Sequence, residues 1–135
     1  MPALFVDTNV FLRVLTRDDP IKFNRCRRLF EQAVAGSVTL YTSELVIAEI
    51  VWTLLSYYEL AKPTVIEKVG QILNTPNLLV KNQEALIEGL ALWSRHNCDF
   101  IDAYNAAVMH RDGLPRLASY DTDFDSFPFI KRQEP

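Results

Sequence analysis

The sequence has 135 residues, of which 49% are hydrophobic and 23% are charged, and its formal net charge is −3. This length suits one domain with a substantial core, and this composition excludes an intrinsically disordered chain. No apolar run is long enough to cross a membrane, and the N-terminus lacks the features of a secretory signal. We expect a single domain spanning residues 1–135, in the cytoplasm and without membrane attachment.

The first predicted element is a short strand that ends in a carboxylate. Residues 3–6 are an uncharged apolar run, as expected of a strand buried on both faces, and Asp7 ends it. Thr8 and Asn9 are residue types that begin helices. In open α/β sheets, ligands bind at the carboxyl ends of central parallel strands, so Asp7 is a candidate ligand-binding residue. The alternative, which an isolated Asp would favour, is that Asp7 only caps the next helix.

The rest of the chain alternates between helix and strand patterns. The predicted helices cover residues 10–15, 20–35, 43–58, 64–73, 83–96 and 98–112. The further predicted strands cover residues 37–41, 78–80, 116–120 and 128–130, of which 78–80 is expected to be central. This alternation predicts an α/β fold with a parallel sheet and helices on both faces.

Three of these elements carry further acidic side chains. Glu49 is the one charged residue between Glu44 and Glu59, in a helix that is apolar almost all round, so we expect it to be buried and functional. Asp99 and Asp102 share the first turn of a helix, where one suits the N-cap and the other, Asp102, suits a ligand. Asp121 ends the predicted strand 116–120, as Asp7 ends the first one.

The neighbouring residues allow other ligand types to be set aside. Asp121, Asp123 and Asp125 resemble the start of a calcium loop, but the Gly and Glu that complete such a loop are missing. Cys26 and Cys98 form no CxxC motif, and neither histidine has a metal-ligand spacing to them. We expect two packed thiols in a reducing compartment and no zinc site.

Four acids, Asp7, Glu49, Asp102 and Asp121, are therefore expected at one edge of the sheet. Like charges raise one another's pKa, and a divalent cation compensates for that repulsion. Oxygen ligands without His or Cys suit Mg²⁺ or Mn²⁺, which predicts metal-dependent hydrolysis of phosphodiesters.

One short stretch is strongly basic. Its cations are Arg13, Arg17, Lys22, Arg25, Arg27 and Arg28. A basic patch beside an acidic site suits a nucleic-acid substrate, although a solvated helix face is the simpler explanation of the stretch alone. The candidate RNA contacts are Arg13, Arg17, Arg25 and Arg28.

Four motifs in this order resemble a PIN-domain nuclease. They are Val-Asp7-Thr-Asn-Val, Ser43-x5-Glu49, Asp99-Phe-Ile-Asp102-Ala and Ser119-Tyr-Asp121-x-Asp-Phe. The resemblance covers essentially the whole chain, whose size makes it most similar to the VapC-type toxins of toxin–antitoxin pairs.

The resemblance implies a three-layer α/β/α fold around a central, mainly parallel sheet of four to five strands. It also implies a Mg²⁺-dependent (or Mn²⁺-dependent) endoribonuclease that forms a homodimer and is inhibited by a cognate antitoxin. The implied catalytic and metal-binding residues are Asp7, Glu49, Asp102 and Asp121. The implied supporting residues are Thr8, Asn9, Asp99, Ser119 and Asp123.

Three alternatives remain open at this point. The chain could be a PIN nuclease of RNA processing outside a toxin–antitoxin pair, or a non-catalytic RNA-binding or interaction module. Retention of all four acids argues against the module, which would be relieved of their repulsion by losing them. A phosphotransferase with Asp7 as nucleophile would want a second Asp where Asn9 stands.

Overall fold

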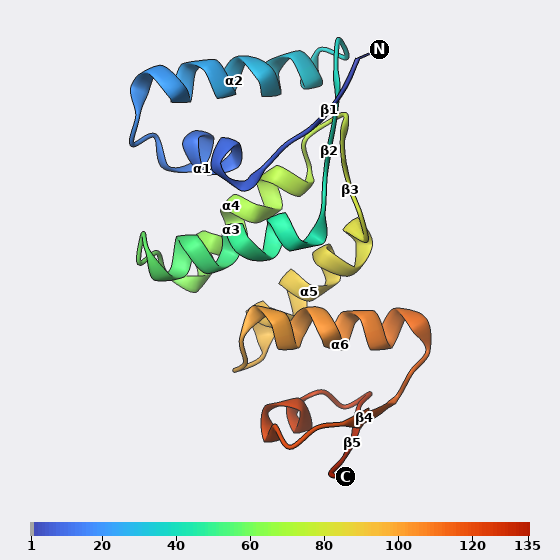
Figure 1. The fold of residues 1–135 in the computed structure, drawn as a ribbon. Helices are drawn as coiled ribbons and strands as arrows, with labels where there is room; N and C mark the ends of the chain where they lie inside the picture. The colour runs from blue at the N-terminus through green and yellow to red at the C-terminus, as the bar shows by residue number, and fades with distance from the viewer. Residues whose placement is uncertain (1) are drawn as a thin grey trace. The chain divides into compact units, whose positions relative to one another are not determined.

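The computed structural model of this chain describes residues 2–135. The chain divides into two compact units, Met1–Gln83 and Glu84–Pro135, and each unit is considered by itself (Figure 1). The described residues form six α-helices, one 3-10 helix and five strands, and every strand pair is parallel. The predicted α/β class with parallel pairing is thereby confirmed.

The first unit places four helices beside a three-stranded sheet of order β1-β2-β3 (Figure 1). Its elements are β1 (Ala3–Phe5), α1 (Thr8–Thr16), α2 (Pro20–Val34), β2 (Thr39–Thr42), α3 (Glu44–Ser56), α4 (Lys62–Leu73) and β3 (Leu78–Val80). The sequence signals explain the helix boundaries: α2 begins at Pro20, and Ser43 caps α3 by accepting the Val46 N–H at 3.3 Å.

In β2 and β3, the sheet of the first unit buries one face and exposes the other. Leu40, in the middle of β2, is fully buried, whereas its neighbour Tyr41 is 42% exposed and Leu79 in β3 is 49% exposed. The residues of β1 are exposed throughout, and Phe5 reaches 64%. The predictions that β1 is buried on both faces and that β3 is central were wrong, because an apolar run does not reveal whether both of its faces are covered.

The second unit is built from α5, α6 and a small two-stranded sheet. Its elements are α5 (Gln83–Arg95, which begins at the boundary), α6 (Phe100–Asp112), β4 (Arg116–Ala118), the 3-10 helix η1 (Thr122–Ser126) and β5 (Lys131–Gln133). Helices α5 and α6 approach closely at Gly89, where a Cβ atom would stand 3.1 Å from the Tyr104 Cα. Gly89 thus permits the backbone contact that sets this packing.

Two strand predictions are corrected here. The last strand covers Lys131–Gln133 instead of residues 128–130. Pro128 has no N–H to donate, and the Ile130 N–H donates to the Phe127 carbonyl in a turn, so pairing starts where the Lys131 N–H donates to the Pro115 carbonyl at 2.7 Å. The five strands also form two sheets, one in each unit, instead of one central sheet. The three-layer arrangement stays a prediction.

Among residues 2–135, no helix combines the length and apolarity that a membrane span requires.

Candidate metal site

In the first unit, the carboxyl ends of β1 and β2 lie side by side. The Val6 N–H donates to the Tyr41 carbonyl at 2.8 Å, and the buried Thr42 hydroxyl donates to the Val6 carbonyl at 2.8 Å. Asp7 follows β1 after Val6, Ser43 directly follows β2, and each is the N-cap of a helix. The sheet thus brings two polar helix starts to one edge.

Asp7 is exposed at this edge, and its Oδ1 accepts the Thr8 N–H at 2.8 Å. The simpler alternative considered for Asp7, a helix cap, is therefore part of its structure. A carboxylate has two oxygens, so one can cap a helix while the carboxylate also serves as a metal ligand. Thr8 is buried and Asn9 is exposed, which places Asn9 on the surface beside Asp7.

Glu49 does not have the buried environment that the sequence suggested. It is exposed on α3, on the same helix face as Leu45 and Trp52, which are 77% and 68% exposed. The buried stripe of α3 is formed by other residues, such as Ile47 and Ile50. The prediction that Glu49 is buried was therefore wrong, and its assignment to the site rests on the motif Ser43-x5-Glu49 alone.

Glu44, in the first turn of α3, carries a buried carboxylate oxygen that sequence analysis did not identify. Its Oε2 atom is shielded from solvent and has no hydrogen-bond partner among residues 2–135. The N-terminal end of the helix dipole stabilises a negative charge at this position. This placement explains how an acid is tolerated there.

In the second unit, Asp102, Asp121 and Asp123 form an acidic cluster. Each offers one carboxylate oxygen, and these oxygens all lie within 4.8 Å of one another. Asp102 comes from α6, Asp121 is the N-cap of η1, and Asp123 lies in η1 itself. Residues from two separate elements therefore present oxygen ligands to one point, as a bound cation requires.

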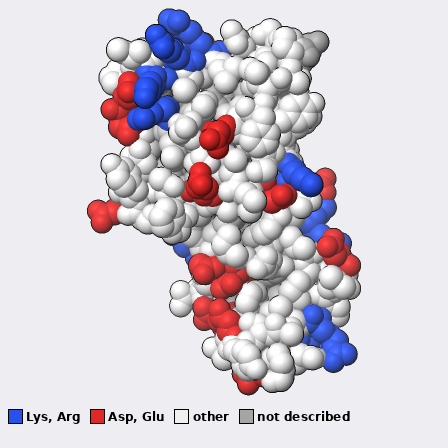
Figure 2. Space-filling model, in the orientation of Figure 1, with Lys and Arg blue, Asp and Glu red and all other residues white. Residues whose placement is uncertain are grey.

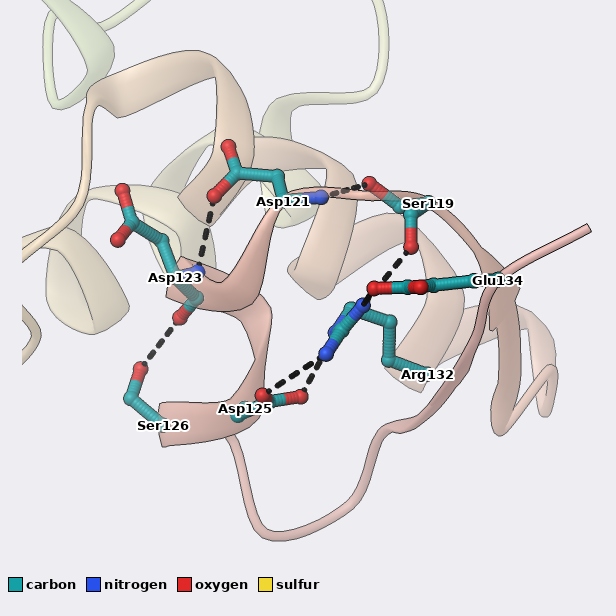
Figure 3. Close-up of polar contacts among 7 residues, drawn as sticks. All are labelled: Ser119, Asp121, Asp123, Asp125, Ser126, Arg132 and Glu134. Atoms are coloured by element: carbon teal, nitrogen blue, oxygen red, sulfur yellow. Dashed lines mark hydrogen bonds and ion pairs between the residues drawn. The ribbon is translucent and has the colours of Figure 1, made fainter.

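Local hydrogen bonds hold each member of the acidic cluster in place, and Figure 3 shows those of Asp121 and Asp123. Asp99 caps α6, and its Oδ1 accepts the Asp102 N–H at 2.9 Å. Asp121 caps η1 and accepts the Asp123 N–H at 2.9 Å, while the Ser119 hydroxyl accepts the Asp121 N–H at 3.0 Å. Ser119 and Asp99 thus fix backbone positions next to the acids.

The electrostatics of the acidic cluster favour a cation. Burial raises the pKa of Asp102 from its ordinary value of 3.8 to about 6, and the nearby charges of Asp99, Asp121 and Asp123 add to the rise. A divalent ion between these carboxylates would reverse that penalty. The donor set is entirely oxygen, which fits Mg²⁺ or Mn²⁺ and not the ions that prefer sulfur or imidazole.

Asp125, the third acid of this turn, is used differently. Its carboxylate accepts two hydrogen bonds from Arg132, at 2.9 and 3.2 Å (Figure 3). The guanidinium holds the pKa of Asp125 below its ordinary value. Sequence analysis missed Arg132, and no local signal points to it, because it reaches the turn through the pairing of β5 with β4.

A basic groove lies between α1 and α2 in the first unit. It is a cavity of about 300 Å³ lined by Asn9, Val10, Arg13, Lys22, Arg25 and Cys26. Figure 2 shows Lys and Arg atoms gathered at the upper left, where Figure 1 places α1 and α2. Two of the four arginines predicted to contact RNA, Arg13 and Arg25, therefore line one concave surface.

The other two predicted RNA contacts lie outside the lining of the basic groove. Arg17 ends α1 with a left-handed backbone (φ 56°), and its guanidinium lies 4.9 Å from the centre of the Phe23 ring. Arg28 is exposed on α2.

The structure thus brings together part of the predicted site. Asp102, Asp121 and Asp123 are joined in the second unit, and Asp7 and Glu49 belong to the first unit. The meeting of all four predicted acids at one metal site stays a prediction.

Comparisons with known proteins match nearly the whole chain. The family model of the PIN domain matches residues 4–130. A VapC ribonuclease of Mycobacterium bovis and ribonuclease VapC13 of Mycobacterium tuberculosis are each 30% identical to it, over 96% of this chain and 98% of theirs. A VapC ribonuclease of Aquifex aeolicus is 25% identical, over 92% of this chain and 91% of its own.

Two solved structures are also similar. One is Mycobacterium tuberculosis VapC20, a toxin that cleaves the sarcin–ricin loop, with 19% identity, 94% and 96% coverage and a TM-score of 0.42. The other is VapBC2 from Rickettsia felis bound to promoter DNA, with 14% identity, 99% and 98% coverage and a TM-score of 0.39. At these TM-scores neither structure supports an argument about this chain.

Proposed function

Because this chain belongs to the PIN-domain family and its VapC ribonucleases, we propose that it is an endoribonuclease that hydrolyses RNA phosphodiester bonds with Mg²⁺ or Mn²⁺. The observation that carries the proposal is the acidic cluster of Asp102, Asp121 and Asp123, whose oxygens lie within 4.8 Å. Such an arrangement is costly without a cation and is useful with one.

In this proposal, Asp7, Asp102 and Asp121 bind the metal directly, and Glu49 completes the acidic site. When bound, the ion lowers the pKa of a coordinated water and offsets the charge that develops on the phosphate. Thr8, Asn9 and Ser119 fix the acids, and Asp99 and Asp123 support Asp102 and Asp121. The protein's own contribution is to hold these oxygens in place before the substrate arrives.

The basic groove supplies a surface for the RNA backbone. Arg13, Lys22 and Arg25 line it together with Asn9, which is only two residues from Asp7. Phosphates bound by such side chains position a nucleic acid without reading its sequence. We propose that RNA enters the site along this groove, and that Arg17 and Arg28 contribute charge from outside its lining.

The relatives suggest a biological setting. They are named VapC ribonucleases, so we propose that this chain is the toxin of a toxin–antitoxin pair. It would then act in the cytoplasm as a homodimer of single PIN domains, held inactive by a cognate antitoxin. An antitoxin gene beside its own gene would support this setting, and its absence would favour RNA processing.

The decisive experiment is cleavage of a mixed RNA substrate by antitoxin-free protein, with and without Mg²⁺. We expect Mg²⁺-dependent cutting, and Asp102→Asn should lower its rate by at least about 100-fold if Asp102 is a direct ligand. Asp112→Asn is the matched control, because Asp112 is an exposed acid at the other end of the same helix. Folded wild-type protein that cuts at no metal concentration would overturn the proposal and favour an RNA-binding module.

A further inference from the structure

Arg132, on β5, lies beside η1 between Ser119 and Asp125, on the side opposite to the carboxylates of Asp121 and Asp123 (Figure 3). Its side chain is only 14% exposed, although it is charged. All of its guanidinium nitrogens donate: Nε and Nη2 bind the two oxygens of Asp125, and Nη1 binds the Ser119 carbonyl at 3.1 Å and Glu134 Oε1 at 3.0 Å. The side chain is therefore fixed in one geometry.

These contacts hold both ends of the segment that contains the two acids. Ser119 precedes Asp121, and Asp125 follows Asp123, so one guanidinium ties residues 119 and 125 together. Between the two tied ends, the Ser119 hydroxyl accepts the Asp121 N–H and Asp121 accepts the Asp123 N–H. The Ser119 N–H also donates to the Gln133 carbonyl at 3.1 Å, so this main-chain bond and Arg132 together anchor the segment that positions both acids.

The chemistry of the contact requires an arginine. A guanidinium presents a planar fork that matches the two oxygens of a carboxylate and still has a third nitrogen for a carbonyl, whereas an ammonium is a point charge. Repulsion among Asp102, Asp121 and Asp123 tends to spread the turn apart before a cation binds. A fixed fork on the far side of the turn opposes that movement.

We propose that Arg132 is a positioning residue of the metal site, which holds the ligand Asp121 and its supporting acid Asp123 in place by anchoring Ser119 and Asp125. It does not contact the metal, since a guanidinium is itself a cation. This inference rests on the proposed function, because it assigns a purpose to the geometry of the acidic cluster.

The test measures Mn²⁺ binding to RNA-free protein by electron paramagnetic resonance, for wild type, Arg132→Lys and Arg116→Lys. Arg132→Lys keeps the charge and loses the fork, and we expect its Mn²⁺ affinity to fall by about tenfold or more. Arg116→Lys is the matched control, since Arg116 is exposed on the paired strand β4 and donates to Gln133 Oε1 at 2.7 Å. Its affinity should stay within about twofold of wild type.

Cleavage kinetics separate positioning from a general loss of structure. For Arg132→Lys we expect a higher Mg²⁺ requirement, with the rate restored at saturating Mg²⁺. A protein that is merely less folded would lose activity at every Mg²⁺ concentration. Asp125→Asn removes the carboxylate that Arg132 binds, and it should raise the Mg²⁺ requirement in the same way. It is the variant to test if Arg132→Lys does not fold.

Amide hydrogen exchange keeps this test distinct from that of the nuclease itself. The Asp121 and Asp123 amides donate to Ser119 and Asp121, and their exchange should be faster in Arg132→Lys than in Arg116→Lys. If the wild type neither binds Mn²⁺ nor cuts RNA, the proposed function is overturned. Faster amide exchange in Arg132→Lys would then still show that Arg132 orders the turn. Folded Arg132→Lys with wild-type Mn²⁺ affinity and exchange overturns the inference.

Discussion

The two units of this chain hold their acids by different means. In the first unit, Asp7 follows a sheet whose buried side is apolar, with Leu40 and Ile47 fully buried. In the second unit, the strands beside the acidic cluster are mostly exposed, and hydrogen bonds that Ser119 accepts from the Asp121 N–H and from Arg132 shape the turn. Apolar packing places Asp7, and a polar network places Asp121 and Asp123.

The difference predicts how each unit responds to substitution. Loss of apolar contacts should reduce the stability of the first unit most, because buried area carries its fold. Loss of a polar contact in the second unit should change metal binding more than stability, because an exposed turn contributes little to the core.

Leu40→Ala should have the largest effect, a loss of about 3 kcal/mol in the free energy of unfolding, because the side chain is fully buried in the middle of β2. Urea denaturation measures this loss. Leu79→Ala is the matched control on the adjacent strand, where the side chain is 49% exposed and the loss should be well under half as large. Equal losses would contradict the assignment of one buried and one exposed sheet face.

Asp102→Asn should stabilise the metal-free protein at alkaline pH. Burial raises the pKa of Asp102 to about 6 in the folded chain, so the folded protein binds this proton more tightly than the unfolded chain does. The stability gained from the bound proton is complete below the ordinary pKa of 3.8 and is lost as the pH rises through about 6. Asparagine does not ionise, so the variant should gain about 1–2 kcal/mol at about pH 8, after allowance for solvent screening, and little near pH 4.

Thermal denaturation in EDTA at the two pH values measures the effect of Asp102→Asn. Added Mn²⁺ should stabilise the wild type and not the variant, because the ion binds the ionised carboxylate. A variant that is less stable than wild type at about pH 8 would show that the charge of Asp102 is not penalised in the folded protein.

Asp7→Ala should cost about 1 kcal/mol, because the Asp7 carboxylate caps α1 through the Thr8 N–H. Asp7→Asn keeps the cap and should cost a few tenths of a kcal/mol at most. In the proposed nuclease both variants lose Mg²⁺-dependent cleavage, so the pair separates capping from metal binding. Similar stability losses in urea would show that the cap contributes little.

Glu49→Gln should have the smallest effect, within about 0.5 kcal/mol, because Glu49 is exposed on α3. Its cleavage rate should nevertheless fall at least about tenfold if Glu49 belongs to the metal site. Thr53→Ser, one turn further along the same helix, is the control for both measurements. Unchanged cleavage by Glu49→Gln would remove Glu49 from the proposed site.

Local signals predicted much of this molecule. Pro20 and Gly36 marked the limits of α2 to within a residue or two, and Ser43 marked the start of α3. The alternation of elements predicted parallel pairing, and the strand–carboxylate pattern of Asp121 pointed to the acidic cluster with Asp102. The helix limits depend on residues that are close together in the sequence, and the parallel pairing was predicted from an alternation of elements that runs along the whole chain.

The features that sequence missed depend on distant contacts. Glu49 was expected to be buried because its neighbours are apolar, yet Leu45 and Trp52 on the same face are themselves exposed. The position of β5 depends on pairing with a strand 15 residues earlier, where Arg116 pairs with Lys131. Hydrophobic periodicity and turn residues do not specify which residues pair across these two strands, so the contacts of Arg132 could not be predicted from the sequence.

The pairing of β4 with β5 has a consequence for how the protein is made. A ribosome synthesises Asp7, Glu49, Asp102 and Asp121 before it reaches Arg132, so the nascent chain carries every proposed ligand before the residue that fastens the turn. A chain stalled or cut before residue 131 keeps the acids but loses the Ser119 and Asp125 anchors. The order of synthesis thus delays the fastening of the acidic turn until translation of this segment is finished.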